Sequence, residues 1–174
     1  MQIVKKGTAL LLAVLLLCAL TLSGCGAAKI EAGDYTGSVR FNHPMELESA
    51  GMDGTATVET VEDWGMDVVI TVDEDGIIWN ITPTEPEGYK GFANFMTWTV
   101  YGGKFISSIT GVYSCADIMK ITVDTEEDGF PVLTGDCGGI HLADKEMTLL
   151  NNQEVACALI ILAMQQAITE NNLA

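Results

Sequence analysis

The sequence contains few basic residues. Of its 174 residues, 24 are Asp or Glu and only 8 are Lys or Arg, so the formal net charge at pH 7 is −16. This excess of negative charge repels phosphate groups, and we therefore expect no nucleic acid partner. The acidity otherwise favours solubility, with recruitment of a cationic ligand as the alternative, and it selects no function by itself.

Motifs for catalysis and metal binding are also missing. His43 and His141 are the only histidines, and neither belongs to an H-E-x-x-H pair. No G-x-S-x-G, P-loop or G-x-G-x-x-G sequence is present, which argues against hydrolases and nucleotide-binding enzymes. Two Asp-rich turns resemble the start of a calcium loop, but Thr82 and Gly135 occupy the positions of its closing Glu ligand. We assign no catalytic or metal-binding residue and favour a non-enzymatic function, with enzymatic activity left open.

The N-terminal segment has the pattern of an export signal. Lys5 and Lys6 precede an apolar run over residues 9–20, and the segment ends in Leu22-Ser23-Gly24-Cys25. This ending resembles a bacterial lipobox, whose Cys receives a diacylglyceryl group and becomes the new N-terminus after cleavage. The resemblance implies lipid on Cys25 and an extracytoplasmic domain anchored to the bacterial membrane. A retained transmembrane helix over residues 7–24 is the alternative, since this stretch has about the minimum length that spans a bilayer.

Cleavage before Cys25 divides the chain into three parts. Residues 1–24 are the signal peptide, residues 25–34 a lipid-anchored linker, and residues 35–174 a single domain of ordinary size. The signal peptide contains Lys5 and Lys6 and no acidic residue, so its removal changes the net charge from −16 to −18.

Three cysteines remain in the predicted domain: Cys115, Cys137 and Cys157. None belongs to a C-x-x-C pair, so neither a zinc site nor a redox dithiol is indicated. In an exported protein Cys115 and Cys137 can form a disulfide, which the sequence neither requires nor excludes. Cys157 lies in an apolar helical pattern and is expected to be a small buried side chain.

Hydrophobic patterns predict a first half that is rich in strands. Strands are expected over residues 35–41 and 55–61, with a short helical turn over residues 45–50 between them. The clearest element is a hairpin over residues 68–81, in which two β-branched runs flank the turn Asp73-Glu74-Asp75-Gly76.

The second half is expected to contain both strands and helices. Residues 95–101 and 104–109 read as strands joined by two glycines, and Ser114 with Asp117 has the spacing of a capping box for a short helix through Met119. The sequence over residues 121–130 repeats the pattern of the first hairpin. It is either a diverged repeat or an independent use of the same turn chemistry.

The C-terminus carries the strongest helical signal. Asn151 can cap a helix over residues 152–168, in which residues 155–164 are apolar without interruption. A helix that is apolar on all sides is expected to be sandwiched against a sheet, with Leu159 and Leu162 facing it. The predicted fold is therefore α+β, an antiparallel β-sheet of hairpins packed against a C-terminal apolar helix.

Three segments, taken in order, resemble a known family. They are Val72-Asp73-Glu74-Asp75-Gly76-Ile77-Ile78-Trp79-Asn80-Ile81, Glu85-Pro86-Glu87-Gly88-Tyr89-Lys90-Gly91 and Ile109-Thr110-Gly111-Val112-Tyr113-Ser114. This order is similar to that of the FMN-binding domain family of exported flavoproteins, with its D-G-x-I turn, E-T-x-G segment and S-G-A-T motif at the start of a helix. The resemblance implies an FMN site that includes Glu85 and Gly88 from the second segment and Thr110, Gly111, Tyr113 and Ser114 from the third.

The third segment departs from the family at its acceptor position. Tyr113 replaces the Thr that often carries the flavin phosphate, so the resemblance implies a non-covalent site. Thr110, Gly111 and Ser114 would then bind phosphate where a turn enters a helix N-terminus, and Trp98 or Tyr113 would stack on the flavin ring.

Two hypotheses of function follow from these patterns. In the first, the lipoprotein binds FMN or another small ligand and takes part in extracytoplasmic electron transfer. In the second, it is a cofactor-free structural or protein-interaction lipoprotein of the cell envelope, with an envelope protein as partner.

Overall fold

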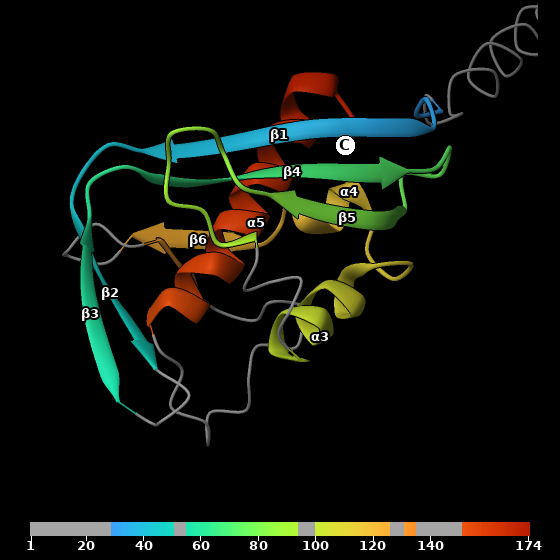
Figure 1. Ribbon diagram of the computed structural model, residues 1–174. Helices are drawn as coiled ribbons and strands as arrows, with labels where there is room; N and C mark the ends of the chain where they lie inside the picture. The colour runs from blue at the N-terminus through green and yellow to red at the C-terminus, as the bar shows by residue number, and fades with distance from the viewer. Residues whose placement is uncertain (1–28, 51–54, 94–99, 126–130, 135–150) are drawn as a thin grey trace, which may run out of the picture.

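The computed structural model describes residues 29–50, 55–93, 100–125, 131–134 and 151–174, and its architecture is α+β (Figure 1). The central antiparallel sheet has the strand order β1-β4-β5. Two further pairs of strands, β2-β3 and β6-β7, form hairpins. The elements in chain order are β1 (Gly33–Phe41), β2 (Met45–Ala50), β3 (Ala56–Val61), β4 (Trp64–Val72), β5 (Ile78–Thr84), α3 (Val100–Ile109), α4 (Cys115–Ile118), β6 (Thr122–Thr125), β7 (Pro131–Thr134) and α5 (Asn151–Asn171).

Strand β4 lies at the centre of the sheet because its side chains alternate in character. Met66, Val68 and Ile70 are completely buried, whereas Asp67 and Val69 between them lie on the half-exposed face. The predicted hairpin with β5 is confirmed, with Ile70 paired to Ile81. One face of the sheet therefore covers the core and the other faces solvent.

Helix α5 is buried on all sides over most of its length, as its apolar sequence predicts. Every side chain from Val155 to Ile161 is buried, Leu159 included, while Leu162 is only half-buried. The helix packs on β1 and β4 on one side and on α4, β6 and β7 on others, and Figure 1 shows it crossing the sheet. The helix runs from Asn151 to Asn171, three residues beyond the predicted end.

Two neighbouring glutamines mark the end of the apolar stretch. The Gln165 side-chain amide donates to the carbonyl oxygens of Ile118 and Ile121, at 3.0 and 2.8 Å. Gln166 accepts a hydrogen bond of 2.5 Å from the Ser38 backbone N–H at the edge of β1. Both side chains thus satisfy backbone groups that the packing of α5 removes from water.

The backbones of β1 and α5 approach each other closely at Gly37. A Cβ atom on Gly37 would lie 2.9 Å from the Ala167 nitrogen and nearer still to the Ala163 carbonyl oxygen. Only glycine on the strand and small residues on the helix permit this contact. The strand and the helix therefore meet without an intervening side chain.

Gly37→Ala should lower the free energy of unfolding by about 1–3 kcal/mol, because the added methyl group meets backbone atoms that cannot rotate away. Gly33→Ala is the matched control in the same strand, since nothing lies within 4 Å of its added Cβ. Urea unfolding of both variants measures the difference. Equal midpoints would show that β1 and α5 separate at little cost.

The junction between the sheet and the β2-β3 hairpin is closed by aromatic rings. Phe41 stacks on Trp64 with ring centroids 4.2 Å apart, and His43 contacts both rings edge-on. The Trp64 Nε1–H donates to the His43 carbonyl oxygen at 2.9 Å. Residues 42–44 lie between β1 and β2 and belong to neither strand.

The prediction of a helical turn over residues 45–50 was wrong. These residues form β2 and pair with β3 in register, from Met45 with Val61 to Ala50 with Ala56. Residues 45–48 alternate apolar and polar side chains, which is the period of a strand.

The prediction of a strand over residues 104–109 was also wrong, because these residues belong to helix α3, which begins at Val100. Phe105 and Ile109 are four residues apart and completely buried, so they form one face of a helix. The glycines taken as a turn lie within the first turns of the helix. Val100 and Tyr101, placed at the end of another strand, belong to α3 as well, and residues 94–99 lie outside the described part.

The predicted short helix and the second hairpin are confirmed. Ser114 caps α4 and forms the predicted capping box with Asp117. Strands β6 and β7 pair antiparallel, and residues 126–130 between them lie outside the described part.

Cys115 is a buried free cysteine, and a disulfide with Cys137 stays untested because Cys137 lies outside the described residues. Burial raises the pKa of the Cys115 thiol to about 11, which disfavours the reactive thiolate. Cys157 is buried within α5, as expected.

Candidate functional site

The chain enters the domain beside the turn between β4 and β5. The Lys29 ammonium group lies 2.5 Å from the Glu74 carboxylate, and Ile30 packs against the core next to Gly76. Lys29 follows Cys25 by four residues, which can span at most about 14 Å. The β4-β5 turn is therefore the part of the domain that lies next to the predicted site of lipidation.

An exposed tryptophan lies at this end of the domain. Trp79 is 56% exposed, and its Nε1–H donates to the Asp73 carboxylate at 2.6 Å. Its ring covers Gly111, where an added Cβ would lie 3.4 Å from the ring edge, and the next residue, Val112, is 66% exposed. We call Asp73, Trp79, Gly111 and Val112 the Trp79 surface.

Asp73 organises the turn beneath this surface. Its carboxylate accepts hydrogen bonds from the Trp79 indole and from the backbone N–H groups of Asp75 and Ile77. The bond from Trp79, followed by that from Ile77, holds the pKa of Asp73 below its usual value. Gly76 completes the turn with a φ of 78°, which favours glycine.

Four residues of the predicted flavin site lie together in the turn between α3 and α4. Thr110, Gly111, Tyr113 and Ser114 follow one another there, and Gly111 has a φ of 72°. The turn is bonded to the start of β5, because the Gly111 N–H donates to the Ile78 carbonyl at 2.7 Å and the Ile78 N–H donates to the Tyr113 carbonyl at 3.0 Å.

The other predicted residues are not brought to this turn. Glu85 and Gly88 follow the far end of β5, a strand of 7 residues that extends about 20 Å. Trp98 and Cys25 lie outside the described residues. Trp79 of β5 lies beside this turn instead, next to Gly111. It was not among the predicted flavin residues, although it follows the predicted hairpin turn closely in the sequence.

The backbone N–H groups of the α3-α4 turn already have acceptors. Those of Thr110, Val112 and Tyr113 donate to carbonyl oxygens of α3. Ser114 donates to the Asp117 carboxylate at 3.2 Å, and Cys115 donates to the Gly76 carbonyl at 2.8 Å. Flavin binding at this turn stays a prediction, and a phosphate there would have to exchange these bonds for its own.

A carboxylate also occupies the start of α4. Asp117 accepts hydrogen bonds from Lys120 and Ser114, and these lower its pKa to about 2. Negative charge at this point opposes a second anion. The turn is therefore suited to structural capping.

Stability should fall as Asp117 is protonated, since its pKa is about 2 in the folded protein against 3.8 ordinarily. A lowered pKa means that the stabilisation is complete above the unfolded value and is lost as the pH falls toward the folded value. Carboxyl NMR titration measures the pKa directly. Lys120→Met should raise it, whereas Lys90→Met, which removes an ion pair with Glu59, should leave it unchanged. Titration of Asp117 near its ordinary value in the unaltered protein would contradict the assignment.

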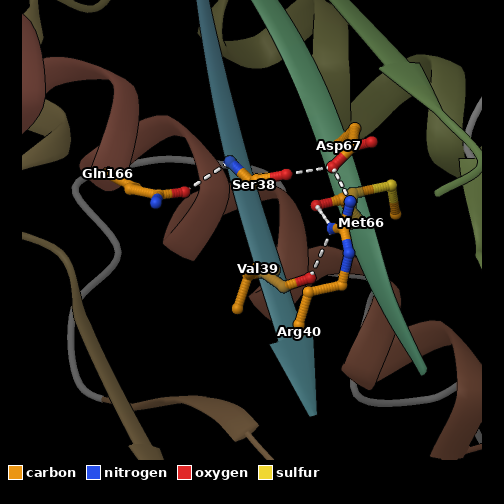
Figure 2. A network of polar contacts seen from close by, with 6 residues as sticks. All are labelled: Ser38, Val39, Arg40, Met66, Asp67 and Gln166. Atoms are coloured by element: carbon orange, nitrogen blue, oxygen red, sulfur yellow. Dashed lines mark hydrogen bonds and ion pairs between the residues drawn. The ribbon is translucent and has the colours of Figure 1, made fainter. Parts of the chain in front are cut away.

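The only arginine of the chain, Arg40, belongs to a polar network on the solvent side of the sheet (Figure 2). Its guanidinium group lies 2.6 Å from the Asp67 carboxylate and also donates to the carbonyl oxygens of Val39 and Met66. Ser38 donates its hydroxyl to Asp67 and its backbone N–H to Gln166 of α5. The network links β1, β4 and α5. The charges of Arg40 and Asp67 therefore stabilise the packing of these elements.

The β2-β3 hairpin lies at the opposite end of the domain from the chain entry (Figure 1). Residues 56–60 of β3 are all exposed, so both faces of the strand meet solvent, and Val58 is 62% exposed. Within the described chain, β2 and β3 pair only with each other. The hairpin thus presents both faces of residues 56–60 to solvent.

The described ranges contain no group of three or more His, Cys, Asp or Glu side chains that could hold a metal ion. No helix among them is both long and apolar enough to cross a membrane.

Comparisons with known proteins add no assignment. No protein-family model, curated protein or solved structure gives a significant match to this chain.

Proposed function

We propose that this protein is a lipid-anchored, extracytoplasmic bacterial lipoprotein whose domain binds an envelope protein without a cofactor. The lipobox pattern supports the anchor at Cys25. The observation that supports an interaction function is the exposure of β3 on both faces, at the end of the domain opposite the chain entry.

The β2-β3 hairpin has the properties of a surface for strand addition. A two-stranded hairpin is marginally stable alone, and the edge of a strand can accept a strand from a partner protein. The segment from Met45 to Glu62 contains five acidic residues and no Lys or Arg. A partner that presents a basic segment is therefore favoured over a second copy of this chain.

Binding of FMN is the alternative function, and the family resemblance is its support. Titration of the purified protein with FMN distinguishes the two hypotheses, because only a flavin site gives saturable quenching of flavin fluorescence. Gly111→Val should then weaken binding more than Ser114→Ala, because Gly111 has a left-handed backbone conformation.

The anchor is tested by mass spectrometry of the protein extracted from membranes. We expect a mature N-terminus at Cys25 that carries the mass of its acyl chains, and Cys25→Ala should abolish that increment. Cys18→Ala, within the predicted signal, is the control and should leave lipidation intact. A mature N-terminus elsewhere would refute the lipoprotein assignment.

The interaction surface is tested by a photo-crosslinking amino acid placed at Val58 in intact cells. A discrete crosslinked product is expected from this position, because Val58 points into solvent on the projecting hairpin. The same probe at Asn80, which is exposed on β5, serves as control and should give none. Equal products from both positions, or none from Val58, would count against the hairpin as the binding surface.

A further inference from the structure

We propose that the Trp79 surface contacts the membrane that carries the anchor, with the Trp79 indole and the Val112 side chain in the interfacial layer of the bilayer. This inference rests on the proposed anchoring of the chain near Cys25. It adds a second point of membrane contact and hence a fixed orientation of the domain.

The position of the tether brings this surface to the bilayer. The packing of Ile30 beside Gly76 and the pairing of Gly33 with Val72 place the start of the domain at the β4-β5 turn, where Lys29 also pairs with Glu74. Glu74 is the neighbour of Asp73, which bonds the Trp79 indole. The four residues from Cys25 to Lys29 span at most about 14 Å, roughly twice the depth of the polar layer on one side of a bilayer, which is about 5–8 Å. The chain length therefore keeps Lys29, which lies beside the β4-β5 turn, within about 14 Å of the predicted lipidation site.

The chemistry of the exposed side chains suits this location. Tryptophan gathers at membrane interfaces because its ring is apolar and its N–H is polar. Trp79 and Val112 are 56% and 66% exposed, and both lie where the β4-β5 hairpin meets the α3-α4 turn. The bond to Asp73 and the contact with Gly111 hold the indole in place, so little rotational freedom is lost on contact with lipid.

The charges around the surface select the kind of lipid. Asp73, Glu74 and Asp75 form the adjacent turn, and Lys29 is the cation that pairs with Glu74. Carboxylates repel anionic headgroups, so contact is expected with a zwitterionic lipid surface. The same charges disfavour a second copy of this chain, which would present an identical acidic turn.

Contact at this surface would orient the whole domain. The β4-β5 turn would face the bilayer, and the β2-β3 hairpin at the other end would point away from it (Figure 1). A tether alone permits the domain to rotate freely, whereas two points of contact keep the hairpin accessible.

The test uses the full-chain protein purified from membranes and reconstituted into phosphatidylcholine vesicles with brominated acyl chains, which quench nearby tryptophans. The chain has three tryptophans, of which Trp64 is completely buried. We expect quenching in the unaltered protein and loss of the quenched component in Trp79→Phe. Val112→Asp should also reduce quenching, and Val58→Asp is the matched control, because Val58 is 62% exposed at the far end of the domain and should leave quenching unchanged.

Anionic lipid provides an independent readout. Replacing part of the phosphatidylcholine by phosphatidylglycerol should weaken quenching at low ionic strength, and added salt should restore it by screening the carboxylates. If Trp79→Phe and Val112→Asp are quenched as strongly as the unaltered protein, the proposal is overturned. Protection of Trp79 from aqueous acrylamide without quenching by lipid would overturn it too, and would indicate a protein contact instead.

The N-terminal mass of the same preparation separates this inference from the proposed function. An acylated Cys25 with unquenched Trp79 would overturn the membrane contact and leave the lipoprotein assignment intact. A quenched Trp79 without an acyl group would support the contact and refute lipidation, with residues 1–24 as the tether. Protein that does not partition with vesicles would overturn both.

Discussion

The burial of α5 is the constraint on which the rest of the domain depends. A helix whose side chains are buried from Val155 to Ile161 has no face for water and must be covered from every direction. The sheet covers one side of the helix and approaches it most closely where Gly37 meets the backbone of Ala163. Elements α4, β6 and β7 cover other sides of the helix. Gln165 and Gln166 end the apolar stretch by bonding backbone groups on two different elements. The core is thus arranged around one helix.

This arrangement gives the domain two distinct ends. At one end the α3-α4 turn is bonded to β5, and Lys29 is paired with the β4-β5 turn, so the chain entry and Trp79 lie together. At the other end, the aromatic contact between Phe41 and Trp64 marks where the strands leave the core as the β2-β3 hairpin. The proposed anchor and the proposed binding surface are therefore held apart by the length of the sheet.

Local signals were sufficient for several elements and misleading for others. The hairpin around Asp73 and Gly76, the capping box of Ser114 and the C-terminal helix each depend on neighbouring residues, so their patterns could be recognised. Residues 45–50 were misjudged because a short segment takes its conformation from the strand it pairs with. Residues 104–109 were misjudged because burial of Phe105 and Ile109 outweighs the low helix propensity of two glycines.

The sequence by itself determined the fold class, the turn chemistry and the residues of the core helix, because all of these are encoded in periodicity and in backbone preferences over a few positions. Only the tertiary structure decided which of those residues meet. It placed Trp79 on Gly111, engaged the donors of the predicted phosphate turn, left Cys115 as a buried thiol and kept Glu85 at the far end of β5. These outcomes depend on contacts between segments far apart in the chain, and such contacts follow from how α5 and the sheet pack together.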